Sequence, residues 1–524
     1  MMFIKRLSLM IALASASTLH LNALTLDESV LEVLDNNPKV VERLKNYRAT
    51  KAQIGVADAN YFPTIDLETA VGREEGGVFL DKVDRTGNWV MEHSLVLRQN
   101  LFDGFGTVEQ VNYEKMQTLA AAHSYLETAN DTTLKAVNVY LEVLRQYELL
   151  INARDNLQEN QKIYDKVLTL YNGGMTTLSE VEKIKTSLSS AEANLILQKN
   201  SVRDAQFSLK RVLGRMVELD EMQIPEFEPP MPESLDKAGA FALQYNPSLQ
   251  ISRYNIKSAQ SLLNQERKNF YPTLDAELSG HYDEYAKSAD ARQDDQEYYR
   301  AMLVLRYNLY RGGSDSAKKQ INISKINQEV AIQQDLRRQT LEGLALSWNS
   351  MDLSIQQIPV LEDYYIHAKR TLALYIDEYN LGRRSLLDLL AAQNDVARSN
   401  AQIINANYKL LYSKYRIMDA MGLTMAAIVD DVDKYYQNVG LRIDEEAEAQ
   451  KSDEQRQKEE EERQDKLPIK NDMDEDFIVD SKDLCDNSEA NASVRAFGCV
   501  RFNDTLDAFD ETTSQEPSQI DDIK

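Results

Sequence analysis

The sequence predicts a mainly α-helical protein with a small β part, built from one unit that occurs twice. Three observations support this fold class. Glycine (19) and proline (11) are scarce among the 524 residues, so long helices are expected. Apolar residues follow heptad spacing over long segments, and four shorter segments alternate between apolar and polar residues. Matching fragments of sequence also recur 208 or 209 residues apart.

Composition and charge limit the function. The chain is 43% apolar and 27% charged, which is a globular balance, and its net charge is −25. Such an acidic chain is a poor nucleic-acid binder, because it lacks the basic groups that replace phosphate counterions. Four of its five histidines, His93, His123, His281 and His367, are scattered without spaced ligand partners. Phosphate loops and nucleophile elbows are also missing from the sequence, so we expect neither an enzyme nor a cofactor.

The first 23 residues have the pattern of an export signal. Lys5 and Arg6 precede an apolar run over residues 7–19, which is too short for a stable membrane span. We expect cleavage after Ala23, although Leu21 is large for its place in the cleavage site. The alternative is a buried N-terminal helix. No later stretch reaches 18 consecutive apolar residues, so an exported chain that spans a membrane would do so with strands.

The recurring fragments keep one register. Asn37-Pro38 returns as Asn246-Pro247, and Leu213-Gly214 returns as Met421-Gly422. The other matches are Tyr61-Phe62-Pro63-Thr64-Ile65-Asp66 with Phe270-Tyr271-Pro272-Thr273-Leu274-Asp275, Asn100-Leu101-Phe102-Asp103-Gly104 with Asn308-Leu309-Tyr310-Arg311-Gly312, and Tyr171-Asn172 and Gly174 with Tyr379-Asn380 and Gly382. We therefore predict two repeats, 24–224 and 235–440, joined by a Pro-rich linker at 225–234.

Each repeat is expected to hold a helix, two strands, a very long helix and a shorter helix. The first helices cover about residues 26–60 and 235–269 and stop before Pro63 and Pro272. The long and short helices form hairpins over residues 105–214 and 314–422, and the shorter helices end at glycines that suit a C-cap.

The alternating segments are the predicted strands, at about 64–71, 89–102, 273–282 and 298–310. One face of each is mostly apolar and the other carries charged residues, as in barrel strands that cross a membrane. A half-buried antiparallel sheet gives the same pattern and remains the alternative. Four strands cannot close a membrane barrel, so the membrane interpretation requires several copies to share strands.

The first long helix carries two apolar seams. One contains Val137, Leu141 and Leu144, and the other contains Ala136, Tyr140 and Val143. They lie about 100° apart around the helix, so one neighbour can pack on each side, as in a curved wall or tube. A single wide stripe in a large bundle is the alternative. Length favours the tube, because residues 176–214 and 235–269, stacked end to end, match one long helix.

Taken together, these motifs resemble the TolC-type outer-membrane efflux proteins over residues 24 to about 435. The resemblance implies a homotrimer in the outer membrane of a Gram-negative bacterium, with a 12-stranded barrel in the lipid continued by a periplasmic α-helical barrel. It implies an exit duct without catalysis, which works with a periplasmic adaptor and an inner-membrane pump, either an ABC or a proton-driven transporter. Such a duct exports drugs or, in type I secretion, proteins. The alternative function is an exported structural or adhesive coiled-coil protein without a pore.

The resemblance also implies a gate at the periplasmic tip. Tyr379 and Arg384 would bond across to the first hairpin, near Ser179 and Glu180, and hold the tip shut. Asp388 would project into the bore, and threefold symmetry would make an acidic ring that favours cations. From the residues alone, Tyr379 could equally belong to a core and Asp388 to a solvated face.

Two further features complete the site residues. Family members carry a second aspartate one turn beyond Asp388, where this chain has Ala391, so the strength of cation selectivity stays open. The turns themselves are expected to form the tip that docks on the adaptor. Their residues are Gly173, Gly174, Met175, Leu381, Gly382 and Arg383.

The C-terminal tail departs from this pattern. Residues 441–524 hold 26 acidic and 11 basic residues, a net charge of −15, as in solvated or partner-binding extensions. Both cysteines, Cys485 and Cys499, lie in this tail. In an oxidising periplasm they could form a disulfide; the alternative is two free thiols.

Overall fold

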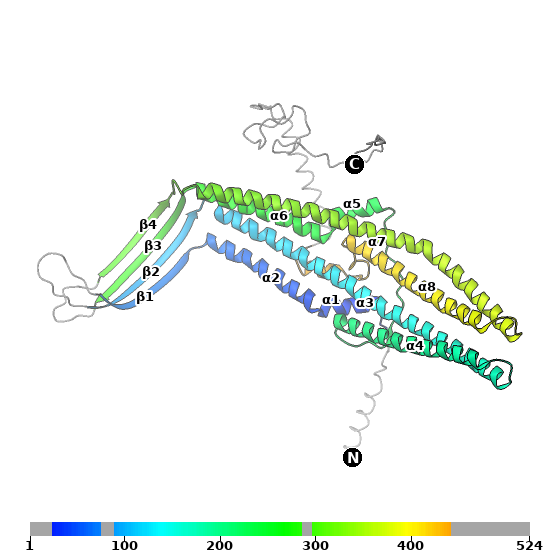
Figure 1. Cartoon of the computed structure of the whole chain (residues 1–524). Coiled ribbons are helices and arrows are strands. Elements are labelled where there is room, and N and C mark those ends of the chain that lie inside the picture. Colours follow the sequence, from blue (N-terminus) through cyan, green and yellow to red (C-terminus); the bar gives the residue numbers. More distant parts are fainter. Residues whose placement is uncertain (1–23, 75–87, 286–295, 442–524) are drawn as a thin grey trace, which may run out of the picture. The chain divides into compact units, whose positions relative to one another are not determined.

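Two helices of 67 residues dominate the structure, α3 (Gly106–Asn172) and α7 (Ser314–Asn380). The computed structural model describes residues 24–74, 88–285 and 296–441. The expected signal peptide, the tail beyond residue 441 and the expected disulfide lie outside these residues. In Figure 1 the strands lie at one end of the long helices and the two hairpin turns at the other. None of the described helices is long and apolar enough to cross a membrane.

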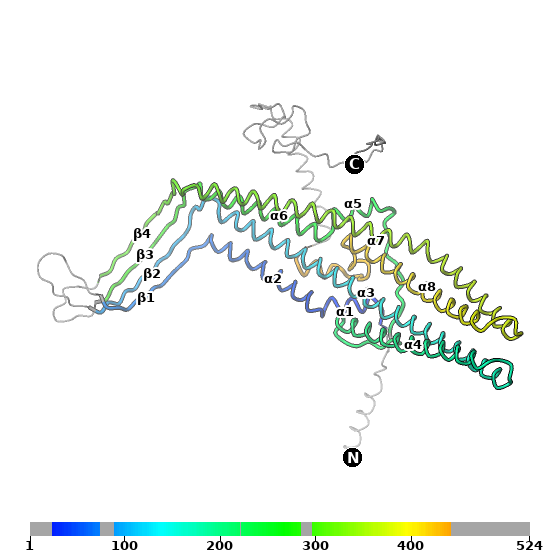
Figure 2. The backbone as a smooth tube through the Cα atoms, viewed as in Figure 1, coloured from blue at the N-terminus to red at the C-terminus, as the bar shows by residue number. Residues whose placement is uncertain are grey.

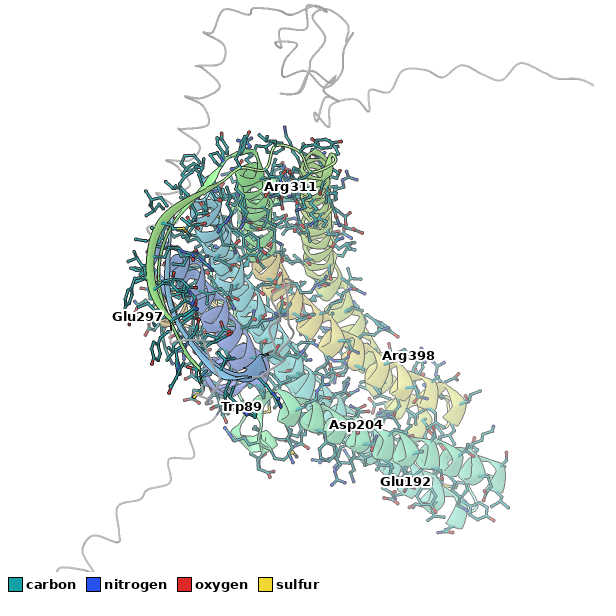
Figure 3. The ribbon with its side chains drawn as sticks, turned by 90° about the vertical axis from the view of Figure 1, so that its left-hand side faces the viewer. Trp89, Glu192, Asp204, Glu297, Arg311 and Arg398 are labelled. Carbon is teal, nitrogen blue, oxygen red and sulfur yellow. The ribbon has the colours of Figure 1, made fainter. Side chains whose placement is uncertain are left out.

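Four antiparallel strands form one sheet in the order β1-β2-β3-β4. They are β1 (Thr64–Glu74), β2 (Asn88–Phe102), β3 (Thr273–Tyr285) and β4 (Gln296–Arg306), and Figure 3 shows them as a curved layer. The fourth strand was expected to reach residue 310 but ends at Arg306, so Tyr307 and Tyr310 lie beyond the sheet. In the described residues β1 and β4 are the two edges of the sheet.

The two faces of the sheet differ in polarity. On one face large apolar side chains are 52–73% exposed: Ile65, Leu67, Val71, Trp89, Leu95, Leu303 and Leu305. On the other face Asp275 accepts hydrogen bonds from Asn100 (2.8 Å) and from Arg306. Arg98 pairs with Glu277 on the same face (3.6 Å). A contiguous face of exposed apolar side chains indicates a surface that contacts protein or lipid in the native state.

The first helix of each repeat is broken, contrary to the expectation of one continuous helix. The first repeat has α1 (Leu26–Asn36) and α2 (Pro38–Asp58), and the second has α5 (Leu235–Tyr245) and α6 (Pro247–Glu266). Asn37 and Asn246 both leave the α region, with ψ of 125° and 127°, and each side chain accepts a hydrogen bond (3.0 Å) from a backbone N–H of the next helix. A residue before proline leaves the α region, and asparagine is a preferred N-cap, so the sequence dictates both breaks.

The same two asparagines join helices end to end. Asn37 donates from Nδ2 to the carbonyl of Val212 (3.3 Å), near the end of α4 (Leu178–Leu213). Asn246 donates to the carbonyl of Ala420 (2.9 Å), the last residue of α8 (Leu386–Ala420). The expected stacking partners were therefore wrong: α4 is continued by α2 of its own repeat, and α8 is continued by α6.

A glycine makes the second junction possible. Gly422 has φ +78°, and a Cβ at this position would lie 2.5 Å from Cδ of Pro247. A side chain would therefore clash with the first turn of α6, and the positive φ would add strain. Close approach of the two helices depends on this residue.

Helix α3 lies at the centre of the packing. It contacts α2 and α4 as well as α6 and α8, while α7 packs on α8 and α6. Members of both apolar seams are buried, among them Val137, Leu141, Tyr140 and Val143. Short helices complete the chain: η1 (Ala59–Tyr61), η2 (Leu219–Glu221), η3 (Arg267–Phe270) and α9 (Asp433–Gln437). The result is a layer of helices of matched length, with α7 at one end of the layer.

Candidate gate at the hairpin tips

The two hairpins turn in the same way. In each, a glycine has positive φ: Gly174 (+69°) and Gly382 (+70°). The next residue donates from its backbone N–H to the carbonyl five residues earlier, at 2.9 Å for both Met175 and Arg383. This is the Schellman arrangement, which satisfies the last carbonyls of a helix and favours glycine at the residue with positive φ. The sequence repeat therefore encodes a repeated turn.

The turns present an exposed apolar surface. Met175 is 70% exposed and Leu381 is 68% exposed. The other residues expected at the docking tip, Gly173, Gly174, Gly382 and Arg383, are exposed as well. Exposed apolar side chains beside bare backbone suit contact with another protein.

Tyr379 joins the two hairpins. It is 8% exposed, and its hydroxyl donates to Oε2 of Glu180 at 3.3 Å. Thr176 donates to the same carboxylate oxygen, within the first hairpin. Burial, together with the charge of Glu180 and the hydrogen bond to it, raises the pKa of Tyr379 to about 12. The phenol therefore stays protonated and keeps its proton for Glu180 at any physiological pH.

Arg384 makes its contacts within the second hairpin, which corrects the expectation that it bonds across to the first. Its Nε donates to Glu378 (2.7 Å), and its guanidinium lies 4.1 Å from the ring centroid of Tyr375. The hydrogen bond to Glu378 is the main cause of a raised pKa of Arg384. These contacts brace the turn between α7 and α8, since Glu378 and Tyr375 lie in the last turns of α7.

Asp388 lies in the first turn of α8. Its side chain accepts from the hydroxyl of Ser385 (2.9 Å), whose Oγ in turn accepts from the backbone N–H of Asp388 (3.2 Å). Arg384 Nη1 lies 3.9 Å from Asp388. This carboxylate therefore serves as part of a helix cap and is partly compensated.

Two other positions complete the predicted set. Ser179 is exposed beside Glu180. Ala391 is exposed and lines a groove whose walls come from α3, α4 and α8, together with Lys183, Ser187 and Asn394. The structure therefore places Tyr379 and Glu180 in contact and keeps Arg384 and Asp388 on one turn.

An apolar cluster underlies the tip and holds both hairpins. It contains Ile163 and Val167 of α3, Val181 and Ile184 of α4, Leu372 and Tyr379 of α7, and Leu386, Leu389 and Leu390 of α8. The hydrogen bond of Tyr379 therefore lies at the edge of a buried surface that spans four helices. Separation of the hairpins would expose part of this surface.

Sequence reasoning missed a set of amide side chains that lies on the side of this cluster away from the tip. Asn156 accepts from Gln393 (3.2 Å), and Asn152 accepts from Asn400 (2.9 Å) and donates to the carbonyl of Ala397 (2.9 Å). We call Asn152, Asn156, Gln393 and Asn400 the amide ladder. It joins α3 to α8 by polar contacts, so apolar periodicity gives no sign of it. The asparagines four residues apart in α3 are the available signal.

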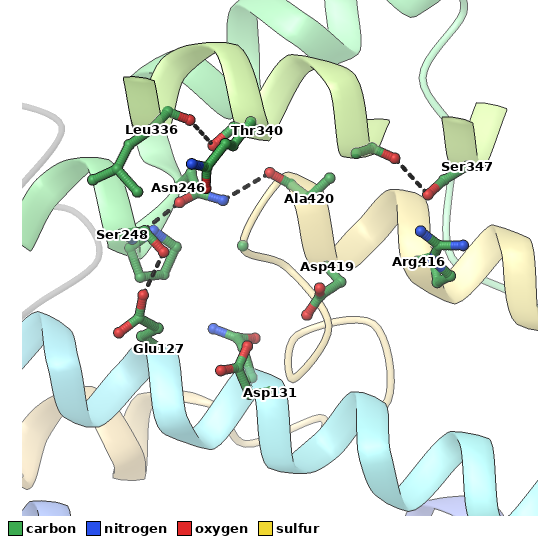
Figure 4. Close-up of a pocket in the computed structure, with 15 residues that line it drawn as sticks. Glu127, Asp131, Asn246, Ser248, Leu336, Thr340, Ser347, Arg416, Asp419 and Ala420 are labelled. Carbon is green, nitrogen blue, oxygen red and sulfur yellow. Dashed lines mark hydrogen bonds between the residues drawn. The ribbon is translucent and has the colours of Figure 1, made fainter. Parts of the chain in front are cut away.

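A second pocket lies where α8 ends against α3, α6 and α7. Figure 4 shows Asp419 of α8 and Asp131 of α3 on facing sides of it. Asp419 accepts from the hydroxyl of Thr424 (3.0 Å). Burial and the charge of Asp131 raise the pKa of Asp419 to about 6. Among the described residues no group of three or more His, Cys, Asp and Glu side chains is placed to hold a metal ion.

Comparisons with known proteins agree with this architecture. Residues 30–215 and 240–423 each match the family described as outer membrane efflux protein. The outer membrane efflux protein BepC of Brucella suis is 23% identical over 403 residues, which cover 76% of this chain and 85% of BepC. The outer membrane protein TolC of Salmonella enteritidis is 23% identical over 342 residues, 63% of this chain and 68% of TolC.

A solved structure shows the same fold. The outer membrane protein VceC of Vibrio cholerae superposes with a TM-score of 0.65 at 18% identity, over 76% of this chain and 96% of VceC. The family, the fold class and the outer-membrane location predicted from the sequence are thereby confirmed. With both of its repeats matched, the chain belongs to the outer membrane efflux protein family and is an efflux channel protein of the outer membrane.

Proposed function

We propose that three copies of this chain form the exit duct of a tripartite efflux or type I secretion system. The duct receives drugs or secreted protein from an inner-membrane pump, an ABC or a proton-driven transporter. A periplasmic adaptor connects the two by binding the hairpin tips. The two tip turns support this docking surface, because they present exposed apolar side chains beside backbone without side chains.

Unpaired edges support the sharing of strands between copies. In the part of the chain that the structure describes, β1 and β4 are unpaired edges of the sheet, and an unpaired edge is a template for another strand. Two copies would give a barrel of eight strands, and side chains fill the interior of a barrel of that size. Three copies give twelve, which leaves room for a channel. The exposed apolar face then meets the lipid of the outer membrane, and the face with Asp275, Arg98 and Glu277 meets water.

The free side of α7 supports the same assembly. Leu346, Leu353, Val360 and Leu374 lie at multiples of seven residues along α7 and are 51–67% exposed. Such a stripe is the pattern of a helix that packs against another helix. Helix α4, on the other side of α3, exposes Ile196, Leu197 and Phe207. Contact of α7 with α4 and α2 of the next copy would cover both surfaces and close a tube.

The single observation that carries the gate is the bond from Tyr379 to Glu180. Among the residues that the structure describes, this hydrogen bond links the tip of one hairpin to the tip of the other. Three copies of this bond would hold the closed state and yield when an adaptor pulls the hairpins apart. Asp388 would form an acidic ring near this constriction and attract cations.

Planar lipid bilayers test the proposed function. Purified protein should insert and give a steady, small conductance, because the tips are closed. A water-soluble rod that gives no conductance would instead favour the exported coiled-coil protein without a pore.

A further inference from the structure

The two repeats of one chain meet at an interface whose two halves occur again on opposite sides of the molecule. Helix α3 of the first repeat packs on α6 and α8 of the second, and β2 pairs with β3. We call this contact the internal interface. By the sequence repeat, α7 and β4 correspond to α3 and β2, while α2, α4 and β1 correspond to α6, α8 and β3. Figure 2 shows α7 along one side of the molecule and α2 and α4 along the other.

The two hairpins of the sheet show that the repeat preserves register. Thr64 of β1 lies opposite Arg98 of β2, and Thr273 of β3 lies opposite Arg306 of β4. Thr273 follows Thr64 by 209 residues and Arg306 follows Arg98 by 208, which are the offsets of the sequence repeat. A contact in one repeat is therefore transferred to the other by these offsets. Applied to the internal interface, the same transfer gives the residues that would meet between two copies.

Two polar bonds join β2 to β3 at the internal interface. Arg98 pairs with Glu277 (3.6 Å), and Asn100 donates to Asp275 (2.8 Å). Both bonds lie on the face of the sheet opposite the exposed apolar side chains. They are the contacts that a further strand would have to reproduce at the two edges of the sheet.

The edge strands carry the same four residue types. The equivalents of the bonded residues are Arg306 and Asn308 after the start of β4, and Glu68 and Asp66 in β1. In the single chain Arg306 donates to Asp275 within its own hairpin. With β1 of the next copy beside β4, Arg306 would reach Glu68 and Asn308 would reach Asp66, as their equivalents do inside the chain.

The length of β4 points to the same partner. Strand β2 pairs with β1 only as far as Arg98, and from there to Phe102 it pairs with β3 alone. The equivalents of these two residues are Arg306 and Tyr310, and β4 ends at Arg306, where its pairing with β3 ends. Tyr310 is 83% exposed. A strand from the next copy would therefore extend β4 to residue 310, which is the length expected from the sequence.

Exposed apolar side chains on α4 correspond to buried ones on α8. Ile196 and Phe207 are 67% and 53% exposed, whereas their equivalents, Ile404 and Tyr415, are 7% and 2% exposed. Both equivalents belong to the apolar cluster around the middle of α3. The helix that corresponds to α3 is α7, so α7 of another copy is the element that would cover Ile196 and Phe207.

One polar pair of the internal interface is replaced by an apolar pair. Arg145 of α3 donates to Asn405 of α8 (2.6 Å). Their equivalents are Leu353 of α7 and Leu197 of α4, which are 51% and 68% exposed. Two exposed leucines at matching positions would bury each other in the contact between copies. The chemistry of both partners has changed together, as a real contact requires.

A second pair becomes ionic. At the internal interface Ser248 of α6 donates to Glu127 of α3. Their equivalents are Lys39 of α2 and Asp335 of α7, and both are exposed. Gln339 donates to Asp335 within α7 (2.7 Å), which orients this carboxylate. Opposite charges therefore occupy the two positions that the register brings together.

Some internal bonds have no such counterpart. The contact of Asn152 with Asn400 in the amide ladder corresponds to Val360 and Glu192, which do not form a complementary pair. The matched pairs thus lie between the sheet and Leu353. Nearer the tips, the contact between copies differs from the internal one.

We propose that the next copy binds in the register of the internal interface. Leu197 of one copy packs on Leu353 of its neighbour, and Lys39 of that copy pairs with Asp335 of the neighbour. Strand β4 lengthens to residue 310 against β1. This inference rests on the proposed function, because it names the residues by which a second copy of this chain is recognised.

Disulfide formation tests the register of the strands in full-length protein that carries Cys485→Ser and Cys499→Ser. The pair Asp66→Cys and Asn308→Cys should link three chains under mild oxidation, because directly opposed side chains have Cβ atoms about 4.5–5.5 Å apart. The control pair Asp66→Cys and Val304→Cys lies on the same face, but about 13 Å further along β4, and should not cross-link. A trimer in native mass spectrometry that cross-links at Val304, or at neither position, would overturn the register and leave the proposed function intact. A particle of one chain would contradict both.

Charge reversal tests the helical part of the interface. Asp335→Lys alone and Lys39→Glu alone should each make the trimer dissociate about tenfold faster in detergent, because like charges then meet between copies. The double variant keeps an ion pair with its charges exchanged, so its dissociation rate should return to within about threefold of wild type. If the two effects add in the double variant, the side chains do not meet, and this part of the register is overturned.

Discussion

Replacement of Tyr379 by phenylalanine isolates the bond on which the proposed gate depends. The change removes one hydroxyl and keeps the ring, which packs with Leu372 and Leu386 in the cluster beneath the tip. Glu180 keeps the hydrogen bond from Thr176. The substitution therefore removes the contact between hairpins with little effect on either hairpin by itself.

The size of the effect follows from the geometry. A hydrogen bond to a charged group contributes about 1.5–3 kcal/mol. At 3.3 Å the Tyr379 bond is long, so we take about 1.5 kcal/mol. If three copies open together, the loss is about 4.5 kcal/mol, which is roughly a 2000-fold shift toward the open state. If each copy opens independently, the equilibrium between its closed and open states shifts about tenfold toward the open state.

Single-channel recording in planar lipid bilayers measures this shift. Tyr379→Phe should show larger or more frequent openings than wild type. Tyr171→Phe is the matched control, because Tyr171 holds the equivalent place in the first hairpin and is exposed. Equal currents in wild type and Tyr379→Phe would show that this hydrogen bond does not hold the tip closed. An equal rise in Tyr379→Phe and Tyr171→Phe would show that the hydroxyl of Tyr379 has no specific role.

Two further predictions concern carboxylates. Asp388→Asn should weaken block by multivalent cations from the periplasmic side about tenfold, or ~1.4 kcal/mol. The asparagine keeps the bond to Ser385, so the cap of α8 is preserved. Unaltered block would place Asp388 away from the bore. Asp419 holds its proton more tightly in the folded protein (pKa about 6) than its ordinary value of 3.8 allows. Its contribution to the free energy of unfolding therefore falls as pH rises from about 4 to 6, by up to about 3 kcal/mol. Asp419→Asn should raise the melting temperature at pH 8 and leave it nearly unchanged at pH 4, and an equal shift at both pH values would contradict this assignment.

Much of the fold follows from local sequence patterns. Heptad spacing around Val137 and Tyr140 predicts a long helix with two packed sides, and alternation around Leu95 predicts a strand. The tip turns follow from Gly174 and Gly382, since positive φ at a helix end is nearly specific to glycine. These features depend on neighbours in the chain, which is why the sequence reveals them.

Features that depend on distant partners were missed or misassigned. The repeated Asn37-Pro38 was visible as a motif, but its donation to Val212 depends on where α4 ends. Apolar periodicity treats Asn152 and Asn156 as ordinary polar positions, so it overlooks a contact made by amides. Arg384 had carboxylates available in both hairpins, and only coordinates show that Glu378 is the nearer partner.

The proposed function requires three copies to enclose the channel, because one copy is incomplete. Native mass spectrometry of the purified protein in detergent tests it most directly. We expect a particle of three chains, held together by the edge strands and by the exposed stripe on α7. A stable particle of a single chain, with its sheet edges and that stripe uncovered, would contradict it.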